Sequence, residues 1–449
     1  MNEVTEYIIG IDLGSAGLIG GLAKREASGT TQLLSIKHLP AKSEIRRGVV
    51  HNVEVVASQI KELLELLLAS QNLDAQVVRV NIGMNGYSLR SVETKSVLPF
   101  SGNERLLDRH LDDLKDDALN ELPEGFEPMD VFPQEFLVDG KPDLNPVGTM
   151  PTQVEGRFQT VIGRPFLSKG LDACFDSLNI QYSPILGPLA TAEAVLRPEE
   201  KKRGVAVFDF GAQTTSLIVF KNSIMRYMAV LPMGGDQINM DLQSVNMDVQ
   251  EAEEYKIEHG SALHYADQLS DEEDPQDVPT LSDREKEYNE VLVARVEEIV
   301  ENLYAQLHYA GVELPKLSDG IVITGGGSRL KDLSTLINKK TGLNVRIGMP
   351  AKDFSSLPAG MDLGAEDALC AGLLLLGQKA CLAPAKPVEV PKASTVSDQR
   401  LEGFDVKPEP PTTPTAPTTP PADGKQRNKK KRTLGFLDRM KNMFDDDDI

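Results

Sequence analysis

Three glycine-bearing loops, two of them following an aspartate, are the residues of this chain with the clearest potential for chemistry. They are Asp12-Leu13-Gly14-Ser15-Ala16-Gly17, Asp209-Phe210-Gly211-Ala212-Gln213-Thr214-Thr215 and Thr324-Gly325-Gly326-Gly327-Ser328. A glycine turn lets backbone N–H groups approach a phosphate without a Cβ in the way. Two such hairpins facing each other, each with one aspartate, could clamp a polyphosphate and hold its Mg²⁺ through water. The pattern predicts a two-lobed nucleotide-binding protein.

A single Asp-x-Gly turn after a strand is more often only a tight hairpin, so the argument rests on its repetition. The loops differ from a P-loop, because no Gly-Lys-Ser/Thr follows them. They also differ from a Rossmann fingerprint, because the first two turns lead into strand-like stretches at 18–23 and 216–220 rather than into helices. A duplicated strand–hairpin–strand unit, one copy in each lobe, explains this order.

Hydrophobic periodicity predicts the elements that must position these loops. The first lobe is expected to contain strands at 7–11, 18–24, 32–38 and 76–83 and helices at about 53–70 and 168–178. Residues 85–162 are interpreted as an insertion with strands at both ends, a charged helix near 108–121 and a proline-rich middle.

The second lobe is expected to start at Gly204, with strands at 205–208, 216–220 and 320–324. The triple glycine that follows the last of these strands is expected to open a helix. An acidic stretch at 267–283 is interpreted as a solvated loop, and a long helix is expected from about 285 to 310.

Composition places limits on the class of protein. The chain has 449 residues, 40% of them hydrophobic, which predicts two or more packed domains. Its formal net charge of −21 argues against general nucleic-acid binding. Cys174, Cys370 and Cys381 are odd in number and unpatterned, as expected in a reducing cytosol. No apolar run is long enough to span a membrane, and the chain enters a strand too early for a signal peptide.

A proline- and threonine-rich linker is predicted at 382–424, followed by a basic, amphipathic tail at 425–449. The tail carries a basic cluster that includes Lys430, Lys431 and Arg432, and an apolar helical stripe of Phe436, Leu437, Met440, Met443 and Phe444. Basic residues beside a short amphipathic helix are typical of a peripheral membrane anchor. The alternative is a helix that docks on its own domain or on a partner. Asp445 to Asp448 would repel anionic lipid, so the anchor is expected to be weak in each copy and to depend on oligomerisation.

The loops and tail together resemble the actin/DnaK/sugar-kinase superfamily, and within it the FtsA family of bacterial cell-division proteins. The resemblance covers about residues 5–380 and the tail. Further stretches that carry it are Arg47 to Asn52, Val80 to Gly86, Leu231 to Asn239 and Ala252 to Gly260.

The resemblance implies an actin-like two-lobed α/β ATPase fold with an inserted subdomain, called 1C in that family. The implied subdomains are 1A (5–84 and 163–203), 1C (85–162), 2A (204–235 and 316–381) and 2B (236–315).

The resemblance also implies ATP in the interlobe cleft, with Asp12 and Asp209 orienting the waters of a bound Mg²⁺. The backbone at Gly14, Ser15 and Ala16 and at Gly211, Ala212, Gln213, Thr214 and Thr215 would wrap the phosphates. Gly235, Gly325, Gly326 and Gly327 would also line the nucleotide site, with Glu253 and Lys256 at the ribose or base edge. Without the resemblance, Glu253 and Lys256 are better interpreted as a surface pair three residues apart.

Several departures from the family pattern affect the expected activity. Ser15-Ala16-Gly17 offers one hydroxyl and no charge, and Ser216 stands where the second loop usually has an aspartate. Before Pro188, where actins and chaperones place a side chain that orients the attacking water, this chain has Gly187. No catalytic residue is identified, and a slow ATPase is the most that is expected.

The implied partner is the C-terminal peptide of the division protein FtsZ, bound through subdomain 2B. Arg295 lies where the family has a basic residue implicated in this contact, and an arginine suits a partly acidic peptide. The alternative is a solvated charge that pairs with Glu298. The resemblance further implies self-association into filaments, other division proteins bound through 1C, and a location on the cytoplasmic side of the inner membrane at the septum.

Two other functional classes remain open. A small-molecule kinase of the same fold would need a catalytic aspartate facing its substrate and would not explain the tail. A pilus-assembly or rod-shape actin homologue would be a scaffold with other partners. A DnaK-type chaperone would need a peptide-binding β-domain after residue 380, which the linker composition excludes.

Overall fold

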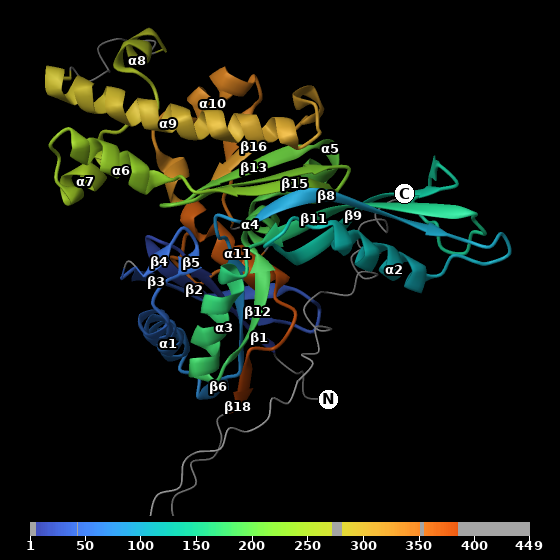
Figure 1. The fold of residues 1–449 in the computed structure, drawn as a ribbon. Coiled ribbons are helices and arrows are strands. Elements are labelled where there is room, and N and C mark those ends of the chain that lie inside the picture. Colours follow the sequence, from blue (N-terminus) through green and yellow to red (C-terminus); the bar gives the residue numbers. More distant parts are fainter. Residues whose placement is uncertain (1–5, 43, 272–280, 351–353, 385–449) are drawn as a thin grey trace, which may run out of the picture.

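The computed structural model describes residues 6–42, 44–271, 281–350 and 354–384, which form two α/β lobes with a pair of helices between them (Figure 1). The predicted basic cluster and amphipathic tail helix lie outside the described residues, as do the linker from residue 385 onward and positions 272–280 of the acidic stretch.

The first lobe is built on a five-stranded sheet in the order β12-β7-β1-β2-β3. The strands are β1 (Glu6–Leu13), β2 (Gly17–Arg25), β3 (Thr31–Pro40), β7 (Arg79–Met84) and β12 (Gln181–Leu186). A small hairpin, β4 (Ile45–Arg46) and β5 (Val49–Val50), precedes helix α1 (Val53–Ser70). α1 and α3 (Phe166–Leu178) pack together and cover one face of the sheet, and α11 (Ala368–Leu376) covers the other.

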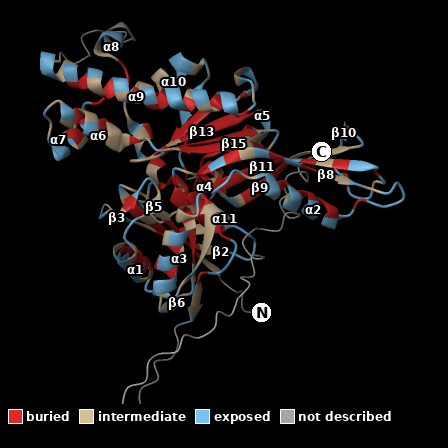
Figure 2. Ribbon diagram, viewed as in Figure 1, coloured by how far each residue is buried: buried red, intermediate tan, exposed pale blue. Residues whose placement is uncertain are grey.

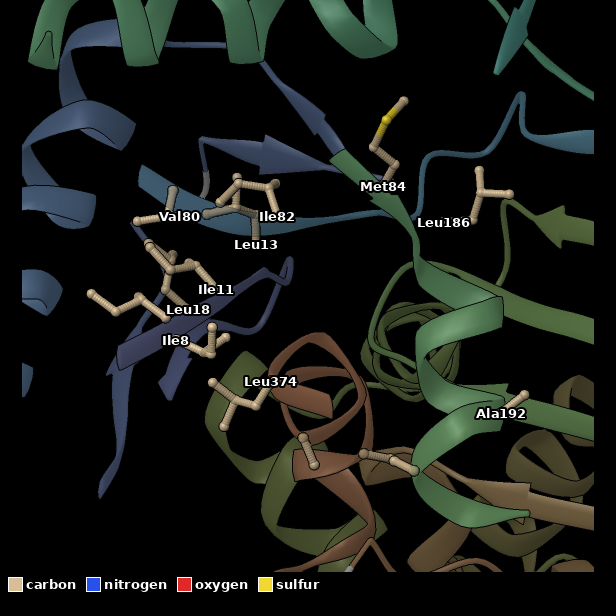
Figure 3. Close-up of a cluster of buried hydrophobic side chains, with 14 of the residues drawn as sticks. Ile8, Ile11, Leu13, Leu18, Val80, Ile82, Met84, Leu186, Ala192 and Leu374 are labelled. Carbon is tan, nitrogen blue, oxygen red and sulfur yellow. The ribbon is translucent and has the colours of Figure 1, made fainter. Parts of the chain in front are cut away.

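Glycine in β1 allows α11 to approach the sheet closely. A Cβ on Gly10 would lie 2.8 Å from the Cβ of Leu373 in α11, so a larger residue would push the helix away. The core beneath the sheet is made by residues such as Ile8, Leu18 and Ile82, which have no exposed surface (Figure 3). This packing fixes the end of β1, where the first aspartate of the loops lies.

The inserted segment extends the sheet of the second lobe. That sheet has nine strands in the order β10-β9-β11-β8-β15-β14-β13-β16-β17. The inserted strands are β8 (Arg90–Pro99), β9 (Glu127–Val138), β10 (Lys141–Pro142) and β11 (Gln153–Gly163), with α2 (Asp108–Ala118) packed on them. The second-lobe strands are β13 (Val205–Phe210), β14 (Thr215–Lys221), β15 (Ile224–Leu231), β16 (Ile321–Thr324) and β17 (Val345–Ile347).

The join between insertion and second lobe was not expected from the sequence. Ala229 of β15 pairs with Arg90 of β8, and Ser91 Oγ accepts a hydrogen bond from Met228 N at 2.9 Å. The side-chain amide of Gln134 donates to Met225 O at 2.9 Å. The insertion is therefore fixed to the second lobe as well as to the first.

Helices cover the outer face of the second-lobe sheet. They are α6 (Gly235–Ser244), α7 (Val249–Glu258), α9 (Asp283–Tyr309) and α10 (Leu333–Thr341). α9 begins where Ser282 accepts a hydrogen bond from Glu285 N and Glu285 returns one, a reciprocal cap. Buried residues along α9, including Leu292, Val296 and Leu303, face this sheet and α6 (Figure 2).

α4 (Gly187–Val195) and α11 lie between the two lobes and pack against each other. A short helix, α5 (Pro198–Arg203), leads from α4 into β13. One buried cluster runs from Ile11 and Leu18 in the first lobe through Ala192 and Leu374 to Val207 in the second. The two lobes thus share part of their hydrophobic core. Among the described residues no helix is both long and apolar enough to cross a bilayer.

Several sequence-based boundaries are corrected. The expected strand at 76–83 is divided at Val78 into β6 (Ala75–Val77) and β7, because β6 pairs with β18 while β7 pairs with β1 and β12. β18 (Leu382–Pro384) occupies the first three residues assigned to the linker.

Two loop predictions also fail in part. The acidic stretch is helical over its first residues, in α8 (Tyr265–Asp271), and its last residue begins α9. The triple glycine opens only a 3-10 turn, Gly326–Arg329, and the next α-helix starts at Leu333. The proline-rich middle of the insertion contains β9, a long strand. All three cysteines are free and buried.

Candidate functional site

The two predicted aspartate loops are hairpins with the same closure. β1 and β2 form one, and β13 and β14 form the other. Gly211 N donates to Thr214 O at 2.9 Å across the second turn. A Cβ would lie 2.7 Å from Gly17 O at Gly14, and 2.8 Å from Thr214 O at Gly211. Both turns therefore require glycine at the matching position.

The hairpins bring the two predicted aspartates close together. Burial, together with the nearby charges of Asp209 and Asp367, raises the pKa of Asp12 to about 7. Burial also raises the pKa of Asp209 to about 6, although the Thr191 hydroxyl, which donates to Asp209 Oδ2 at 3.0 Å, opposes the shift. Crowded negative charge of this kind is stabilised by a cation.

Asp367 is a third acidic group, which the sequence reasoning missed. It lies directly before α11, where Gly364 N donates to its Oδ2 at 2.9 Å. Its Oδ1 is 2.7 Å from His38 Nε2, and this hydrogen bond raises the pKa of His38. The only signal for it was an acidic pair before an apolar helix, which is also the pattern of an ordinary helix start.

The third glycine loop packs directly on the second aspartate. Gly325 has a φ of +80°, and a Cβ there would be 2.3 Å from Asp209 Oδ1. Gly325 N donates to Ala365 O at 3.1 Å. A Cβ on Gly327 would lie 3.0 Å from that of Phe210, whereas Gly326 faces open space. The structure therefore brings Gly325 and Gly327 to the second hairpin.

The start of α6 packs on the second hairpin. Gly235 N donates to Gly211 O at 3.0 Å, and Asp236 N donates to Ala212 O at 2.7 Å. A Cβ on Gly234 would be 2.4 Å from Gly211 O, so this approach also depends on glycine. The predicted residue Gly235 therefore lies at the site through its backbone.

Gln213 connects the two lobes. Its side-chain nitrogen donates to Asp236 Oδ2 at 2.9 Å, and its side-chain oxygen accepts from the backbone N of Arg47 at 3.0 Å. Arg47 lies in the turn between β4 and β5 of the first lobe and adopts a φ of +51°. The sequence predicted only the backbone of Gln213 for the site, and the cross-lobe bond was missed because it depends on tertiary structure.

Glu253 and Lys256 form the expected pair on one face of α7. Lys256 Nζ lies 2.6 Å from Glu253 Oε2 and 3.5 Å from Gly235 O. Asn239 of α6 also donates to Glu253. Burial raises the pKa of this carboxyl, but the bonds from Lys256 and Asn239 together outweigh burial and lower the pKa below its usual range. The pair is therefore anchored to α6 beside the second hairpin, and it is more than an isolated surface pair.

Arg295 on α9 is held by two acidic groups. Its guanidinium makes two hydrogen bonds to Asp241 of α6, at 2.5 and 3.1 Å, and a third to Glu298. The pairing with Glu298 was expected from the sequence, and the stronger one with Asp241 was not. The arginine is only partly exposed in this arrangement.

The absence of a side chain at position 187 has a packing reason. A Cβ on Gly187 would lie 2.9 Å from Asn85 Cβ and 3.0 Å from Met84 O. A glutamine or glutamate there would displace the end of β7. The close contact between α4 and the end of β7 therefore requires glycine at position 187, where the superfamily places a larger side chain.

These residues fit a polyphosphate with its cation. Two glycine hairpins offer backbone N–H groups, and a cation would lower the raised pKa values of the Asp12 and Asp209 carboxyl groups, which lie near Asp367. Within the described part of the chain, no three acidic, histidine or cysteine side chains come together to hold a metal ion directly. A cation here would be held through water.

Comparison with known proteins supports the resemblance found in the loops. A family model described as "Cell division protein FtsA" matches residues 206–364. A curated protein of that name from Porphyromonas gingivalis is 28% identical over 76% of this chain and 72% of its own length. Those from Borreliella burgdorferi and Neisseria meningitidis are 27% and 26% identical and cover 76% and 78% of this chain, 84% and 85% of their own.

Among solved structures, a "PilM-PilN type IV pilus biogenesis complex" aligns with a TM-score of 0.60 at 18% identity, covering 82% of this chain and 97% of that chain. This likeness shows the fold alone. It agrees with the two-lobed, actin-like architecture expected from the duplicated hairpins.

Proposed function

This chain belongs to the family of the cell-division protein FtsA and has an actin-like fold, and from that premise we propose that it is a nucleotide-binding scaffold that links FtsZ filaments to the cytoplasmic membrane at the septum. The observation that carries the proposal is the pair of glycine hairpins with Asp209 close enough to Asp12 to raise its pKa, in a chain whose curated relatives named above share one name as division proteins. The subdomain boundaries given above are part of the proposal.

ATP with Mg²⁺ is the proposed ligand. The hairpin backbones at Gly14–Ala16 and Gly211–Thr214 would bind phosphate, Asp12 and Asp209 would orient the hydration waters of the cation, and Gly325–Gly327 would border the adenosine. When bound, the nucleotide supplies charge that holds the two lobes together. Any turnover would be slow and would regulate assembly, because no side chain of the described site is placed as a general base.

Partner binding is proposed at subdomain 2B and in the tail. Arg295 would receive an acidic FtsZ peptide, and the observed bonds to Asp241 and Glu298 mean that the peptide carboxylate must compete with two internal ones. Such competition keeps each contact weak. The tail would hold the membrane weakly in each copy, so self-association would supply the avidity.

Liposome co-sedimentation of purified FtsZ with this protein tests the proposal. Full-length protein is compared with a truncation that ends at Gly424, on vesicles with and without anionic lipid. We expect the full-length protein, and not the truncation, to bring FtsZ to anionic vesicles. If the truncation still binds vesicles, the membrane anchor lies in the body of the protein and not in the tail.

An Arg295→Ala variant separates the partner contact from the membrane contact. It should still bind vesicles and should bring down less FtsZ, whereas Lys316→Ala, an exposed control in the same lobe, should behave as the wild type. If the wild type binds vesicles while FtsZ stays in solution, the partner assignment is wrong and a pilus-type or rod-shape scaffold becomes the better reading of this fold.

A further inference from the structure

Asn85 is a residue of the first lobe to which the sequence assigned no function. It directly follows β7, whose neighbours in the sheet are β1 and β12. Ile82 is in register with Ile11, and Met84 with Leu186, so Gly14, Asn85 and Gly187 follow three adjacent parallel strand ends. In open α/β sheets, ligands bind outside the carboxyl ends of such strands.

The side chain of Asn85 lies on the same face of the first-lobe sheet as that of Asp12. A Cβ on Gly83 would meet Leu369 of α11, and a Cβ on Gly10 would meet Leu373 of the same helix. Side chains alternate along a strand, so Asn85 and Asp12, two residues further on, continue on this face. The contact of Asn85 Cβ with Gly187 at the start of α4 agrees with this direction.

α4 links Asn85 to the second aspartate. Gly187 and Thr191 are four residues apart and lie on one face of the helix. The first packs on Asn85, and the second donates to Asp209 Oδ2. The carboxamide and the Asp209 carboxylate therefore contact the same face of α4 within one helical turn.

The side-chain oxygen of Asn85 is buried and has no hydrogen-bond partner within the described residues. A buried acceptor left in this state costs stability and is normally satisfied by protein or by ordered water. Asn81, four residues earlier and within β7, is buried, and its amide donates to Ile9 O at 3.0 Å. Five described side-chain oxygens are buried without a partner, those of Asn85, Gln159, Asn239, Asn289 and Glu366. Of these, the oxygen of Asn85 is the one that follows the parallel strand ends, where a group from outside the protein would satisfy it.

We propose that Asn85 is a positioning residue whose side-chain oxygen holds one water molecule facing the terminal phosphate of the bound nucleotide. This inference rests on the proposed nucleotide site. The Asn85 carboxamide fills the space in which a side chain at position 187 would begin. Because Gly187 has no side chain to orient the attacking water, Asn85 orients it instead.

The step that this water enters is hydrolysis. The water oxygen attacks the terminal phosphorus, the bond from that phosphorus to the bridging oxygen breaks, and the electron pair leaves on the diphosphate. The water proton passes to the released phosphate. Asn85 accepts a hydrogen bond from the water and takes no proton, so the rate stays low while remaining dependent on this residue.

The test compares Asn85→Leu with Asn81→Leu in the full chain. Both replace an asparagine by an apolar side chain of similar shape, Asn81 within β7 and Asn85 directly after it. The measurements are the affinity for a non-hydrolysable ATP analogue with Mg²⁺, the single-turnover rate of phosphate release, and the urea midpoint of the nucleotide-free protein. Asn85→Asp serves as the conservative variant because it keeps an acceptor oxygen.

Asn85→Leu should bind the analogue within about 2-fold of wild type and release phosphate about 10²-fold more slowly, because a misplaced nucleophile costs that much. Its urea midpoint should be unchanged or higher, since an unpaired buried acceptor has been removed. Asn81→Leu should show the opposite, a lower midpoint and an unchanged rate per bound nucleotide. Asn85→Asp should bind less tightly and recover most of the rate.

Three outcomes would overturn the inference. They are an unchanged rate in Asn85→Leu, a urea midpoint lowered as much as in Asn81→Leu, and a wild type that binds ATP without releasing phosphate above background. A wild type that fails to bind nucleotide at all would instead refute the proposed function of the cleft.

Discussion

The β1–β2 hairpin and the β13–β14 hairpin close in the same way, and they differ in how they are fixed to the rest of the molecule. The first is bonded within its own lobe, where Ala41 N donates to Ala16 O at 3.1 Å. The second is packed against α6 and the Gly325 loop, and through Gln213 it reaches Arg47 of the opposite lobe. The sheet alone shapes the first loop, whereas tertiary contacts also hold the second. We infer that lobe closure is coupled to phosphate binding mainly through the second hairpin.

The largest effect is expected from breaking the packing of the second hairpin. Gly325→Ala places a Cβ 2.3 Å from Asp209 Oδ1 in a backbone with a φ of +80°. It should lower the free energy of unfolding by about 3 kcal/mol, measured by urea denaturation. Gly326→Ala, next to it and facing open space, should cost less than about 1 kcal/mol. Equal losses in the two variants would mean that the Gly325 loop does not brace the hairpin.

The second prediction concerns the ionisation of Asp12 and Asp209 and distinguishes the two residues. The pKa of Asp12 is about 7 in the folded protein, above its usual 3.8. The folded state therefore binds the proton more tightly, and stability is lost as pH rises from about 4 through 7. Asp12→Asn removes this loss, so at pH 8 the nucleotide-free variant should be about 2 kcal/mol more stable than wild type, allowing for partial exposure.

The comparison with Asp209→Asn sharpens this result. The gain there should be smaller, because the pKa of Asp209 is about 6 and Thr191 already hydrogen-bonds its charged form. Thermal unfolding of both variants between pH 4 and 8 measures the difference. Both should lack the stabilisation by Mg²⁺ and ATP that we expect for the wild type. A wild type whose stability is flat from pH 5 to 8 would contradict the crowding of negative charge.

The cross-lobe bond is the third target. Gln213→Ala removes the hydrogen bonds to Asp236 and to the backbone of Arg47, and should cost about 1 kcal/mol. Spin labels on introduced surface cysteines, one in each lobe, should show a broader interlobe distance without nucleotide; the native cysteines are buried and should not compete for label. Ser15→Ala in the first hairpin is the control and should leave the distances unchanged. The coupling is disproved if both variants give the wild-type distribution.

The smallest effect is expected at His38. Its hydrogen bond to Asp367 raises its pKa above the usual 6.5, so the pair contributes stability below pH 6.5 that is lost as pH rises through the folded value. Because the imidazole is half exposed, His38→Ala should cost less than about 1 kcal/mol at pH 6, and less again at pH 8. Exposed His51→Ala is the control. A loss that grows with pH would have the wrong sign for this pair.

Much of the fold followed from local patterns. The strands of both hairpins, helix α1 and helix α9 lie within a few residues of their predicted positions, because their apolar periodicity and caps are local properties. The division of the strand at Val78 could not be predicted, since it depends on β18, which comes from the far end of the described chain. The same holds for the pairing of β8 with β15, which joins segments more than a hundred residues apart.

The sequence by itself determined that Asp12 and Asp209 each precede a glycine turn, because residue order and the backbone freedom of glycine are enough to specify a hairpin. Tertiary structure decided that the Asp12 carboxyl lies near those of Asp209 and Asp367, that Gln213 reaches Arg47, and that Asn85 packs on Gly187 at the start of α4. Burial and the proximity of distant charges arise only when the two sheets close on α4 and α11. That is why residue order predicted the two hairpins, whereas the ionisation of their aspartates depends on burial and on distant charges.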